Sequence, residues 1–373
     1  MFTHWDDKGV NLRMELLRGI YGSGFEEPSP IQRQAIPLIL SGRDLLAQAQ
    51  SGTGKTGAFC IGVLQKLTLS GPEAIILSPT RELAIQTKEV FDKLGSAMGA
   101  RSKLLIGGSP IDHDLSDVRR NKYHALIGCP GRVCDFLNNR VITATDIKMI
   151  VLDEADEILS QGFQDQVQAI FKFMSEAAQV LMFSATVSES LKEIMHKIMN
   201  NPEQILVDST MLTLEGISQH YVMVQHDRDK FEVLKDLYAG LTVSQSIIYC
   251  NSVKRVHDLY TSMKSEGYPV CCIHGEMDRT ARTEAYNEFK SGKYRMLISS
   301  DITARGIDIQ QVSVVINFDI PKVVETYLHR IGRSGRWGRK GMGINFVTTY
   351  DVDKMKAIEK YYSTEITEFK QLG

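Results

Sequence analysis

Asp44-Leu45-Leu46-Ala47, an apolar run, is followed by Ala49-Gln50-Ser51-Gly52-Thr53-Gly54-Lys55-Thr56 and then by an apolar stretch with helical spacing. This order of strand, glycine-rich loop and helix is typical of a phosphate-binding loop. The glycines let backbone N–H groups turn inward around phosphates, and the helix adds its dipole. Lys55 is placed to reach the β- and γ-phosphates, and the Thr56 hydroxyl to bind Mg²⁺. Ala49 stands where the usual pattern has glycine, so the strand–loop–helix context carries the prediction.

A second polar motif ends another buried run, where Val151-Leu152 leads into Asp153-Glu154-Ala155-Asp156. Carboxylates at the carboxyl end of a parallel strand lie where α/β sheets bind ligands. We expect Asp153 to hold Mg²⁺ and Glu154 to orient and deprotonate an attacking water. The alternative is an acid-rich helix start that only favours the helix dipole. Because a phosphate loop lies upstream in the same domain, the two motifs together predict nucleoside triphosphate hydrolysis.

Short runs rich in Val, Ile and Leu alternate with longer segments of helical spacing along the whole chain. Strands that are apolar on both faces and alternate with helices predict parallel sheets covered on both sides. A polar stretch at 209–217 separates two halves that repeat this scheme. We therefore expect two α/β domains in tandem, residues 1–208 and 218–373, joined by a short linker at 209–217.

Composition limits the class of protein. The 373 residues suit two domains of roughly 100–200 residues each. With 43 Lys+Arg against 45 Asp+Glu there is no global excess of positive charge, which argues against a simple basic nucleic-acid binder. No apolar stretch is long enough to span a membrane, and the six cysteines lack zinc-site spacing. Basic residues do cluster locally, as a solvated face or a ligand site, at Arg330, Arg333, Arg336, Arg339 and Lys340.

These motifs, in this order, resemble those of the DEAD-box family of ATP-dependent RNA helicases, whose name Asp153–Asp156 spells. Upstream, Gly24-Phe25-Glu26-Glu27-Pro28-Ser29-Pro30-Ile31-Gln32 resembles the family's Q motif. The resemblance implies that Gln32 reads the adenine edge and Phe25 packs on its ring, which favours ATP over GTP. The alternative, a turn-rich segment, fits the two prolines equally well. Trp5 lies further from Gln32 than the family's isolated aromatic residue.

The resemblance implies two tandem RecA-like domains that share ATP and Mg²⁺. In the first domain, ATP would be bound by Phe25, Gln32 and residues 49–56. The metal would be held by Thr56 and Asp153. In the second, Asp308 of the motif Ser300–Asp308 would touch the ribose. Lys55 and Glu154 would act in catalysis with two arginine fingers, Arg333 and Arg336, from the motif His329–Arg336.

RNA contacts are also implied by the resemblance. The first domain's motifs are Pro79-Thr80-Arg81-Glu82-Leu83-Ala84, Gly107-Gly108 and Pro130-Gly131-Arg132. Loop N–H groups and arginines suit a sugar–phosphate backbone, although loop glycines usually only turn the chain. Cys129 replaces the threonine usual before Pro130, and Arg279 replaces a glutamine in the pattern that ends at Arg282. The implied RNA-binding residues are Arg81, Gly107, Gly108, Pro130, Gly131, Arg132, Arg282 and Ser300.

A last set of residues would couple hydrolysis to strand separation. Ser184-Ala185-Thr186 matches the family's coupling motif, with an ordinary helix cap as the alternative. Asp156 and His329 would take part in the same interdomain coupling. The family further implies that ATP and RNA together favour a closed arrangement of the two domains.

Within the family, four segments resemble the translation initiation factor 4A subgroup: 16–21, 212–217, 309–313 and 359–364. We therefore expect an RNA-stimulated ATPase that locally unwinds short RNA duplexes in translation initiation. The alternative within the family is an RNA clamp or remodelling factor in nuclear RNA processing or ribosome assembly, and a DNA motor of the same superfamily is a further rival. The expected partners are RNA, with little sequence preference, and initiation scaffold proteins. A cytoplasmic monomer without membrane contact is expected, with the nucleus as the other location.

Overall fold

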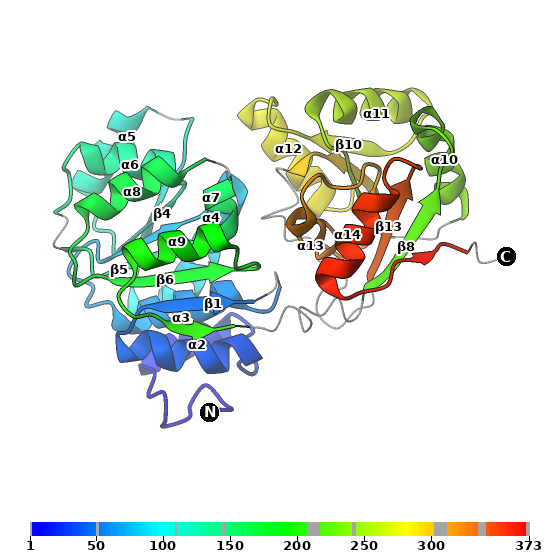
Figure 1. The fold of residues 1–373 in the computed structure, drawn as a ribbon. Coiled ribbons are helices and arrows are strands. Elements are labelled where there is room, and N and C mark those ends of the chain that lie inside the picture. The colour runs from blue at the N-terminus through cyan, green and yellow to red at the C-terminus, as the bar shows by residue number, and fades with distance from the viewer. Residues whose placement is uncertain are drawn as a thin grey trace. The chain divides into compact units, whose positions relative to one another are not determined.

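The computed structural model describes residues 2–49, 52–108, 110–143, 146–160, 162–206, 217–240, 244–301, 312–334 and 341–370. The chain divides into two compact units, Met1–Val207 and Asp208–Gly373, each with its own sheet (Figure 1). Of the predicted linker at 209–217, only Ile217 is among the described residues, and it begins a strand.

The first unit is a parallel sheet in the order β3-β4-β2-β5-β6-β1-β7. Its strands are β1 (Leu45–Gln48), β2 (Ala74–Leu77), β3 (Ser102–Leu105), β4 (Ala125–Gly128), β5 (Met149–Asp153), β6 (Gln179–Ser184) and β7 (Glu203–Ile205). Its helices are α1 (Met14–Gly22), α2 (Pro30–Ser41), α3 (Lys55–Lys66), α4 (Arg81–Gly95), α5 (Ile111–Arg120), α6 (Pro130–Asn138), α7 (Ala155–Ser160), α8 (Gln164–Phe173) and α9 (Glu189–Ile198).

The second unit repeats this plan, with parallel strands in the order β10-β11-β9-β12-β13-β8-β14. Its strands are β8 (Ile217–Met223), β9 (Gln245–Tyr249), β10 (Val270–Ile273), β11 (Met296–Ser299), β12 (Val312–Asn317), β13 (Gly341–Val347) and β14 (Thr367–Glu368). Its helices are α10 (Lys230–Gly240), α11 (Val253–Ser265), α12 (Arg279–Lys290), α13 (Val324–Ile331) and α14 (Val352–Tyr362). The expectation of two α/β units with parallel sheets is confirmed.

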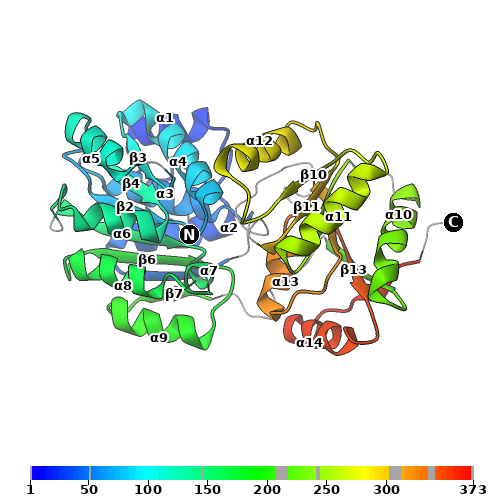
Figure 2. The ribbon, with the colours of Figure 1, turned by 90° about the horizontal axis from the view of Figure 1, so that it is seen from above.

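Both faces of each sheet are buried, which explains why the strands read as apolar runs. Successive residues of a strand point to opposite faces, so Leu45 and Ala47 of β1 join one core and Leu46 joins the other. In the first unit, α2 and α3 cover one face, and α8 and α9 cover the other (Figures 1 and 2). In the second unit, α10 and α11 cover one face, and α13 and α14 the opposite face.

The strand order brings three of the predicted motifs together. In the first sheet β5, β6 and β1 are consecutive neighbours. The phosphate loop follows β1, the acidic motif ends β5, and Ser184 ends β6. Because the strands are parallel, their carboxyl ends meet at one edge of the sheet, where α/β proteins bind ligands.

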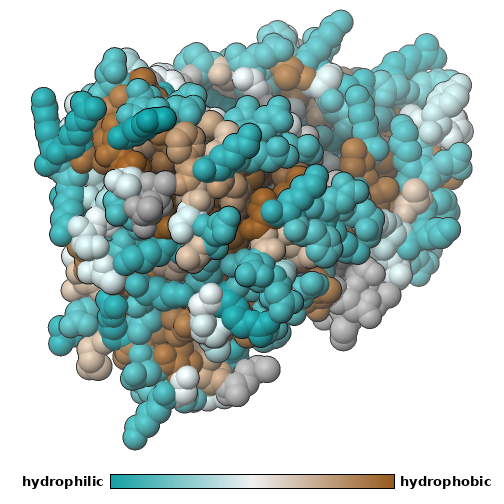
Figure 3. Space-filling model, turned by 60° about the vertical axis from the view of Figure 1, so that its left-hand side comes forward, coloured by the Kyte–Doolittle hydropathy of each residue, from teal (hydrophilic) through white to brown (hydrophobic). Residues whose placement is uncertain are grey.

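Hydrophilic side chains cover most of the face seen in Figure 3, and hydrophobic residues show between them in separate patches. None of the helices in the described parts of the chain is long and apolar enough to cross a membrane. All six cysteines are free thiols, and Cys60, Cys250 and Cys271 are buried in the cores. Burial raises the pKa of the Cys60 thiol well above its usual value, which keeps it protonated.

Candidate functional site

The predicted phosphate loop turns sharply between β1 and α3. Gly52 and Gly54 have φ angles of 85° and 100°, in the left-handed region that glycine adopts without strain. The Ala49 backbone N–H donates to the Ser184 carbonyl oxygen at 3.0 Å, which ties the start of the loop to β6. Gln50 and Ser51 lie outside the described residues.

The segment predicted to read adenine packs directly on this loop. The Gln32 side chain is 2% exposed; its Nε2 donates to the Gly54 carbonyl at 3.1 Å, and its Oε1 accepts from the Ser29 N–H at 2.7 Å. A Cβ atom added to Gly57 would lie 2.7 Å from Gln32 Nε2 and 2.9 Å from Phe25 Cε1. The first turn of α3 therefore needs glycine at 57 so that Phe25 and Gln32 can approach it.

The Trp5 side chain packs against Phe25 of this segment. Its side chain is fully buried, and its ring meets that of Phe25 edge-on, with 6.3 Å between the centroids. Phe2 packs on the other side of Trp5 at 6.0 Å. Such edge-to-face pairs add about 0.5–1.5 kcal/mol beyond burial. Trp5 thus contacts the adenine-reading segment through Phe25, although it lies further from Gln32 in sequence than the family's isolated aromatic residue.

The acidic strand end forms the charged centre of the site. Lys55 Nζ lies 3.1 Å from Glu154 Oε2, and both residues are nearly inaccessible, at 5% and 6%. Glu154 has a φ of 49°, a strained value for a residue with a side chain, and such strain is common at functional sites. Burial, and then the neighbouring Glu154 carboxylate, raise the pKa of Asp153 well above its usual value, and Lys55 opposes that shift.

Asp156 joins the acidic motif to the predicted coupling motif. Its Oδ2 accepts from the Thr186 N–H at 3.1 Å and from Thr186 Oγ1 at 2.7 Å, while its own N–H donates to Ser184 Oγ at 3.3 Å. Ser184 Oγ in turn donates to the Thr186 carbonyl at 2.7 Å. Three of the four residues predicted to couple hydrolysis to movement therefore form one bonded group in the first unit.

The donor set fits a magnesium ion that is shared with phosphates and water. Asp153 is a buried carboxylate whose charge is disfavoured by its surroundings, so a cation beside it would be stabilising. Thr56, the second residue of α3, is only half-buried. Mg²⁺ usually takes one or two protein oxygens and keeps several waters. No group of three or more His, Cys, Asp or Glu side chains that could hold a metal ion occurs in the described parts of the chain.

The predicted RNA-binding residues of the first unit differ in the contacts that they make. Arg81 begins α4 after Thr80, which caps that helix by accepting from the Leu83 N–H at 3.3 Å. The Arg81 guanidinium lies against Gly108, where an added Cβ would come within 2.9 Å of Nη2. Gly108 has a φ of 99°, so both space and backbone require glycine there. The first two RNA motifs are thus in contact.

Arg132 is engaged in a buried ion-pair cluster. Its Nη1 lies 3.6 Å from Asp114 Oδ2, and both side chains are less than one tenth exposed. Asp114 also pairs with Lys103 at 3.1 Å, and Lys103 with Asp117 at 2.6 Å. Arg132 therefore ties α6 to α5 and β3, and its contact with RNA stays a prediction. Pro130 opens α6 and Gly131 follows it, with open space at its Cα.

In the second unit, the described site residues lie along α12, the end of β11, and α13. Arg282 is half-buried on α12, and Ser300 follows β11 and is 8% exposed. His329 lies on α13, and Arg333, 3% exposed, follows the helix and donates through Nε to the His329 carbonyl at 3.1 Å. Asp308 and Arg336 lie outside the described residues, as do Gln50 and Ser51.

The basic cluster is not a solvated face at its described positions. Arg330 is fully buried, and its guanidinium contacts Asp301, Asn317, Asn251 and the Asp319 carbonyl. Of the two interpretations offered for residues 330–340, a solvated face or a ligand site, the solvated face is therefore excluded for Arg330. Its partners are acids and amides from distant parts of the chain, which a local pattern of charges does not reveal.

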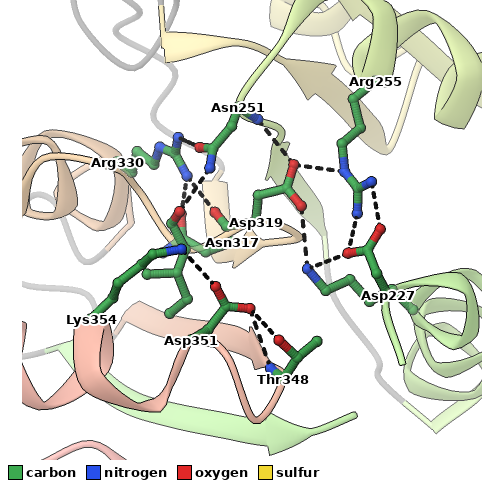
Figure 4. A network of polar contacts seen from close by, with 11 residues as sticks. Asp227, Asn251, Arg255, Asn317, Asp319, Arg330, Thr348, Asp351 and Lys354 are labelled. Carbon is green, nitrogen blue, oxygen red and sulfur yellow. Dashed lines mark hydrogen bonds and ion pairs between the residues drawn. The ribbon is translucent and has the colours of Figure 1, made fainter. Parts of the chain in front are cut away.

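The described turn between β8 and α10 in the second sheet takes the place that the phosphate loop has between β1 and α3 in the first, and it differs from that loop. Lys230 begins α10 after β8, as Lys55 begins α3 after β1. In the second unit the intervening turn, Val224–Asp229, has no glycine, and Lys230 Nζ lies between Asp227 at 3.0 Å and Asp319 at 3.2 Å. Arg255 pairs with the same two carboxylates (Figure 4). Lys230 and Arg255 line a cavity of about 240 Å³ at this position. Their charges are already compensated by these two carboxylates.

One hydrogen bond and one residue that matter for the site were missed from the sequence. Ser29 and Gln32 have the Ser-x-x-Gln spacing of a capping box at the start of α2, and the half of it in which Gln32 Oε1 accepts from the Ser29 N–H is formed. Gly57 was missed because a glycine inside a helical run gives no hint of what approaches it.

Comparisons with known proteins agree with this geometry. The DEAD/DEAH box helicase family model matches residues 29–194, and the helicase conserved C-terminal domain model matches residues 229–338. The ATP-dependent RNA helicase FAL1 of Vanderwaltozyma polyspora is 47% identical over 364 residues, covering 96% of this chain and 91% of that protein. The eukaryotic initiation factor 4A of Caenorhabditis elegans is 46% identical, covering 97% of this chain and 90% of that protein.

Among solved structures, S. cerevisiae Dbp5 bound to RNA and ADP BeF3 superposes with a TM-score of 0.90. It is 36% identical in sequence, and the match covers 96% of this chain and 94% of that one. The likeness thus extends over both units, and the tandem RecA-like fold expected from the sequence is confirmed.

Proposed function

Since this chain belongs to the DEAD/DEAH box helicase family and is an ATP-dependent RNA helicase, we propose that ATP is hydrolysed where Lys55 and Glu154 meet. The observation that carries this proposal is the gathering of three motifs at one edge of the first sheet. A phosphate loop, a buried carboxylate pair and the Ser184–Thr186 segment are joined there by backbone and side-chain bonds.

Different residues of the first unit have different roles in hydrolysis. Loop N–H groups and Lys55 hold the β- and γ-phosphates, so phosphate oxygens replace Glu154 as the partner of the lysine. The Glu154 carboxylate is then available to orient a water molecule and accept its proton. Gln32 keeps unused hydrogen-bonding capacity on both amide atoms, because each makes one hydrogen bond within the described residues, and that capacity can read adenine.

We propose that Asp153 and Thr56 hold Mg²⁺, which when bound supplies neutralisation of phosphate charge. The buried Asp153 carboxyl, with its raised pKa, supports this assignment, because it gains from a neighbouring cation. From the second unit we propose that Asp308 contacts the ribose and that Arg333 and Arg336 stabilise the transferring phosphoryl group, with His329 coupling the units. Arginine fingers contribute about 10³–10⁵ in rate in related chemistry.

For RNA we propose contacts through the sugar–phosphate backbone and 2′-hydroxyl groups, with little sequence preference. The contact of Arg81 with Gly108 supports a shared surface for the first two RNA motifs. Arg282 and Ser300 are the proposed contacts in the second unit. Arg132 would have to exchange Asp114 for a phosphate, so its contribution depends on breaking a buried pair.

We propose a cytoplasmic role in translation initiation with scaffold proteins as partners, supported by the likeness to a protein named eukaryotic initiation factor 4A. The likeness to FAL1, a protein named only as an ATP-dependent RNA helicase, is equally strong. We therefore keep as the alternative a remodelling factor in nuclear RNA processing or ribosome assembly. Affinity capture of the tagged chain, with identification of the bound proteins, separates these roles: initiation scaffolds support the first, and ribosome-precursor proteins support the second.

The test of the proposed chemistry is strand separation of a short RNA duplex. We expect the purified full chain to separate it only with ATP and a divalent cation, and an equivalent DNA duplex to remain paired. GTP is expected to support the reaction poorly because of Gln32. Separation without ATP, or equal activity on DNA, contradicts the proposal.

A further inference from the structure

Arg330 is a fully buried cation of the second unit whose guanidinium makes four hydrogen bonds to groups from other elements. Nε lies 2.5 Å from Asp301 Oδ1. Nη1 donates to Asn317 Oδ1 at 3.1 Å and to the Asp319 carbonyl at 2.7 Å, and Nη2 donates to Asn251 Oδ1 at 2.7 Å (Figure 4). The Tyr249 ring lies 5.3 Å from the guanidinium. This guanidinium therefore binds the ends of β9 and β12 together with the helix that carries it.

Asn317 extends these bonds into the interior of the sheet. It is fully buried on β12, where it pairs in register with Asn345 of β13, and its Nδ2 donates to Asn345 Oδ1 at 2.8 Å. Asn345 Nδ2 donates to the Tyr327 hydroxyl at 3.3 Å and to the His220 carbonyl at 2.9 Å. Tyr327 and Arg330 are one turn apart on α13, so two successive turns of the helix contact the same pair of asparagines.

The polar contacts of Arg330, Asn317 and Asn345 are not needed simply to hold α13 against the sheet. Leu328 and Ile331 already pack in the core between helix and sheet. Buried ionic groups are costly to desolvate and can often be replaced by apolar residues without loss of stability. Directional bonds, however, fix a helix along and around its axis more closely than apolar packing does.

The position of α13 matters because Arg333 lies only two residues after Ile331, the last residue of the helix. Arg333 is 3% exposed, and its Nε donates to the His329 carbonyl of the same helix. A shift of α13 therefore moves the guanidinium of Arg333 directly. Displacement of a catalytic group by about 1 Å can cost 10²-fold in rate.

We propose that Asn317 is a positioning residue for ATP hydrolysis. It acts through Arg330 to fix α13, and thereby Arg333, in the geometry that catalysis requires. The inference rests on the catalytic role proposed above for Arg333.

The test begins with Asn317→Leu, which keeps the size of the side chain and removes both of its hydrogen bonds. We expect the RNA-stimulated kcat for ATP to fall about 10- to 100-fold, with KM for ATP and for RNA nearly unchanged, as for a misplaced catalytic group. Asn317→Asp keeps an acceptor for Arg330 and is expected to restore most of the lost kcat. An unchanged kcat in Asn317→Leu, or an Asn317→Asp variant as slow as the leucine variant in the folded state, overturns the proposal.

A double-mutant cycle then separates positioning from a general structural role. If Asn317 acts through Arg333, Asn317→Leu lowers kcat little further once Arg333 is alanine. Additive losses overturn the inference and leave the role of Arg333 intact, whereas an Arg333→Ala variant with normal kcat contradicts that role itself. Asp351→Asn is the matched control, because Asp351 bonds Thr348 and Lys354 at the same sheet end and no described contact joins it to α13. The control is expected to keep its kcat.

Discussion

Lys55 Nζ and Glu154 Oε2 form a buried ion pair at 3.1 Å, joining the start of α3 to the end of β5. The pair brings together the two groups on which phosphate binding and water activation depend. Each charge compensates the other in a place almost closed to water, and Glu154 keeps its strained backbone there.

Replacement of Lys55 by methionine is expected to destabilise the first unit by about 3 kcal/mol, because it leaves a buried carboxylate without its cation. Glu154→Gln in the same background should recover a large part of this loss, since the uncompensated charge is removed. Urea unfolding of the full chain, followed by the fluorescence of buried Trp5 after Trp337 has been replaced by phenylalanine in every variant, measures both effects. Equal stability of the single and double variants would contradict the compensation.

Gly57→Ala is expected to raise KM for ATP about tenfold with a small effect on kcat, because the new methyl group displaces Gln32 and Phe25. Alanine would otherwise favour the helix by nearly 1 kcal/mol. The measurement is steady-state ATPase kinetics, with Gly22→Ala as the control. A Cβ at Gly22 meets no atom within 4 Å. Normal KM in the Gly57 variant would show that this packing does not serve nucleotide binding.

Thr186→Val is expected to uncouple hydrolysis from strand separation. The variant keeps its shape and loses the hydroxyl that donates to Asp156 at 2.7 Å. We expect duplex separation per ATP to fall about tenfold, in line with the loss of a buried bond to a charged group, while ATPase activity remains. Thr87→Val is the control, because the buried Thr87 hydroxyl has no hydrogen-bond partner in the described parts of the chain. Parallel loss of both activities would contradict the coupling role.

Glu73 gives the first unit a defined dependence on pH. It accepts bonds from Lys148 and from Thr68, and although burial opposes the shift, these bonds lower its pKa from 4.5 to about 2. Because the folded pKa is depressed, its contribution is fully present above pH 4.5 and is lost as pH falls towards 2.

Glu73→Gln is therefore expected to destabilise the chain by about 2–3 kcal/mol at neutral pH, with the difference shrinking as pH falls through this window. Urea unfolding measured at several pH values checks this. Exposed Glu176→Gln serves as the control and should change little. A difference that does not depend on pH would contradict the assignment.

Much of the site could be predicted from local sequence because the chemistry lies in contiguous motifs at strand ends. The phosphate loop, Asp153–Asp156 and Ser184–Thr186 each follow an apolar run, and parallel strands bring such ends to one edge. The fold followed from the same runs, since strands buried on both faces carry no polar alternation.

What could not be predicted depends on partners that are distant in the sequence. Arg330 and Arg333 look alike in a basic run, yet Arg330 meets Asn251, Asp301 and Asn317 and becomes a buried anchor. Arg132 likewise meets Asp114 from the preceding helix. A one-dimensional pattern shows that a charge is present and does not show which group will compensate it.

The most direct test of the central claim is the steady-state ATPase rate of the full chain, with and without single-stranded RNA, beside that of Glu154→Gln. We predict that RNA accelerates hydrolysis by the unaltered chain, whereas Glu154→Gln binds ATP with similar affinity and loses at least about 10²-fold in kcat. An ATPase that RNA does not accelerate, or a Glu154→Gln variant that hydrolyses ATP normally, would contradict the account.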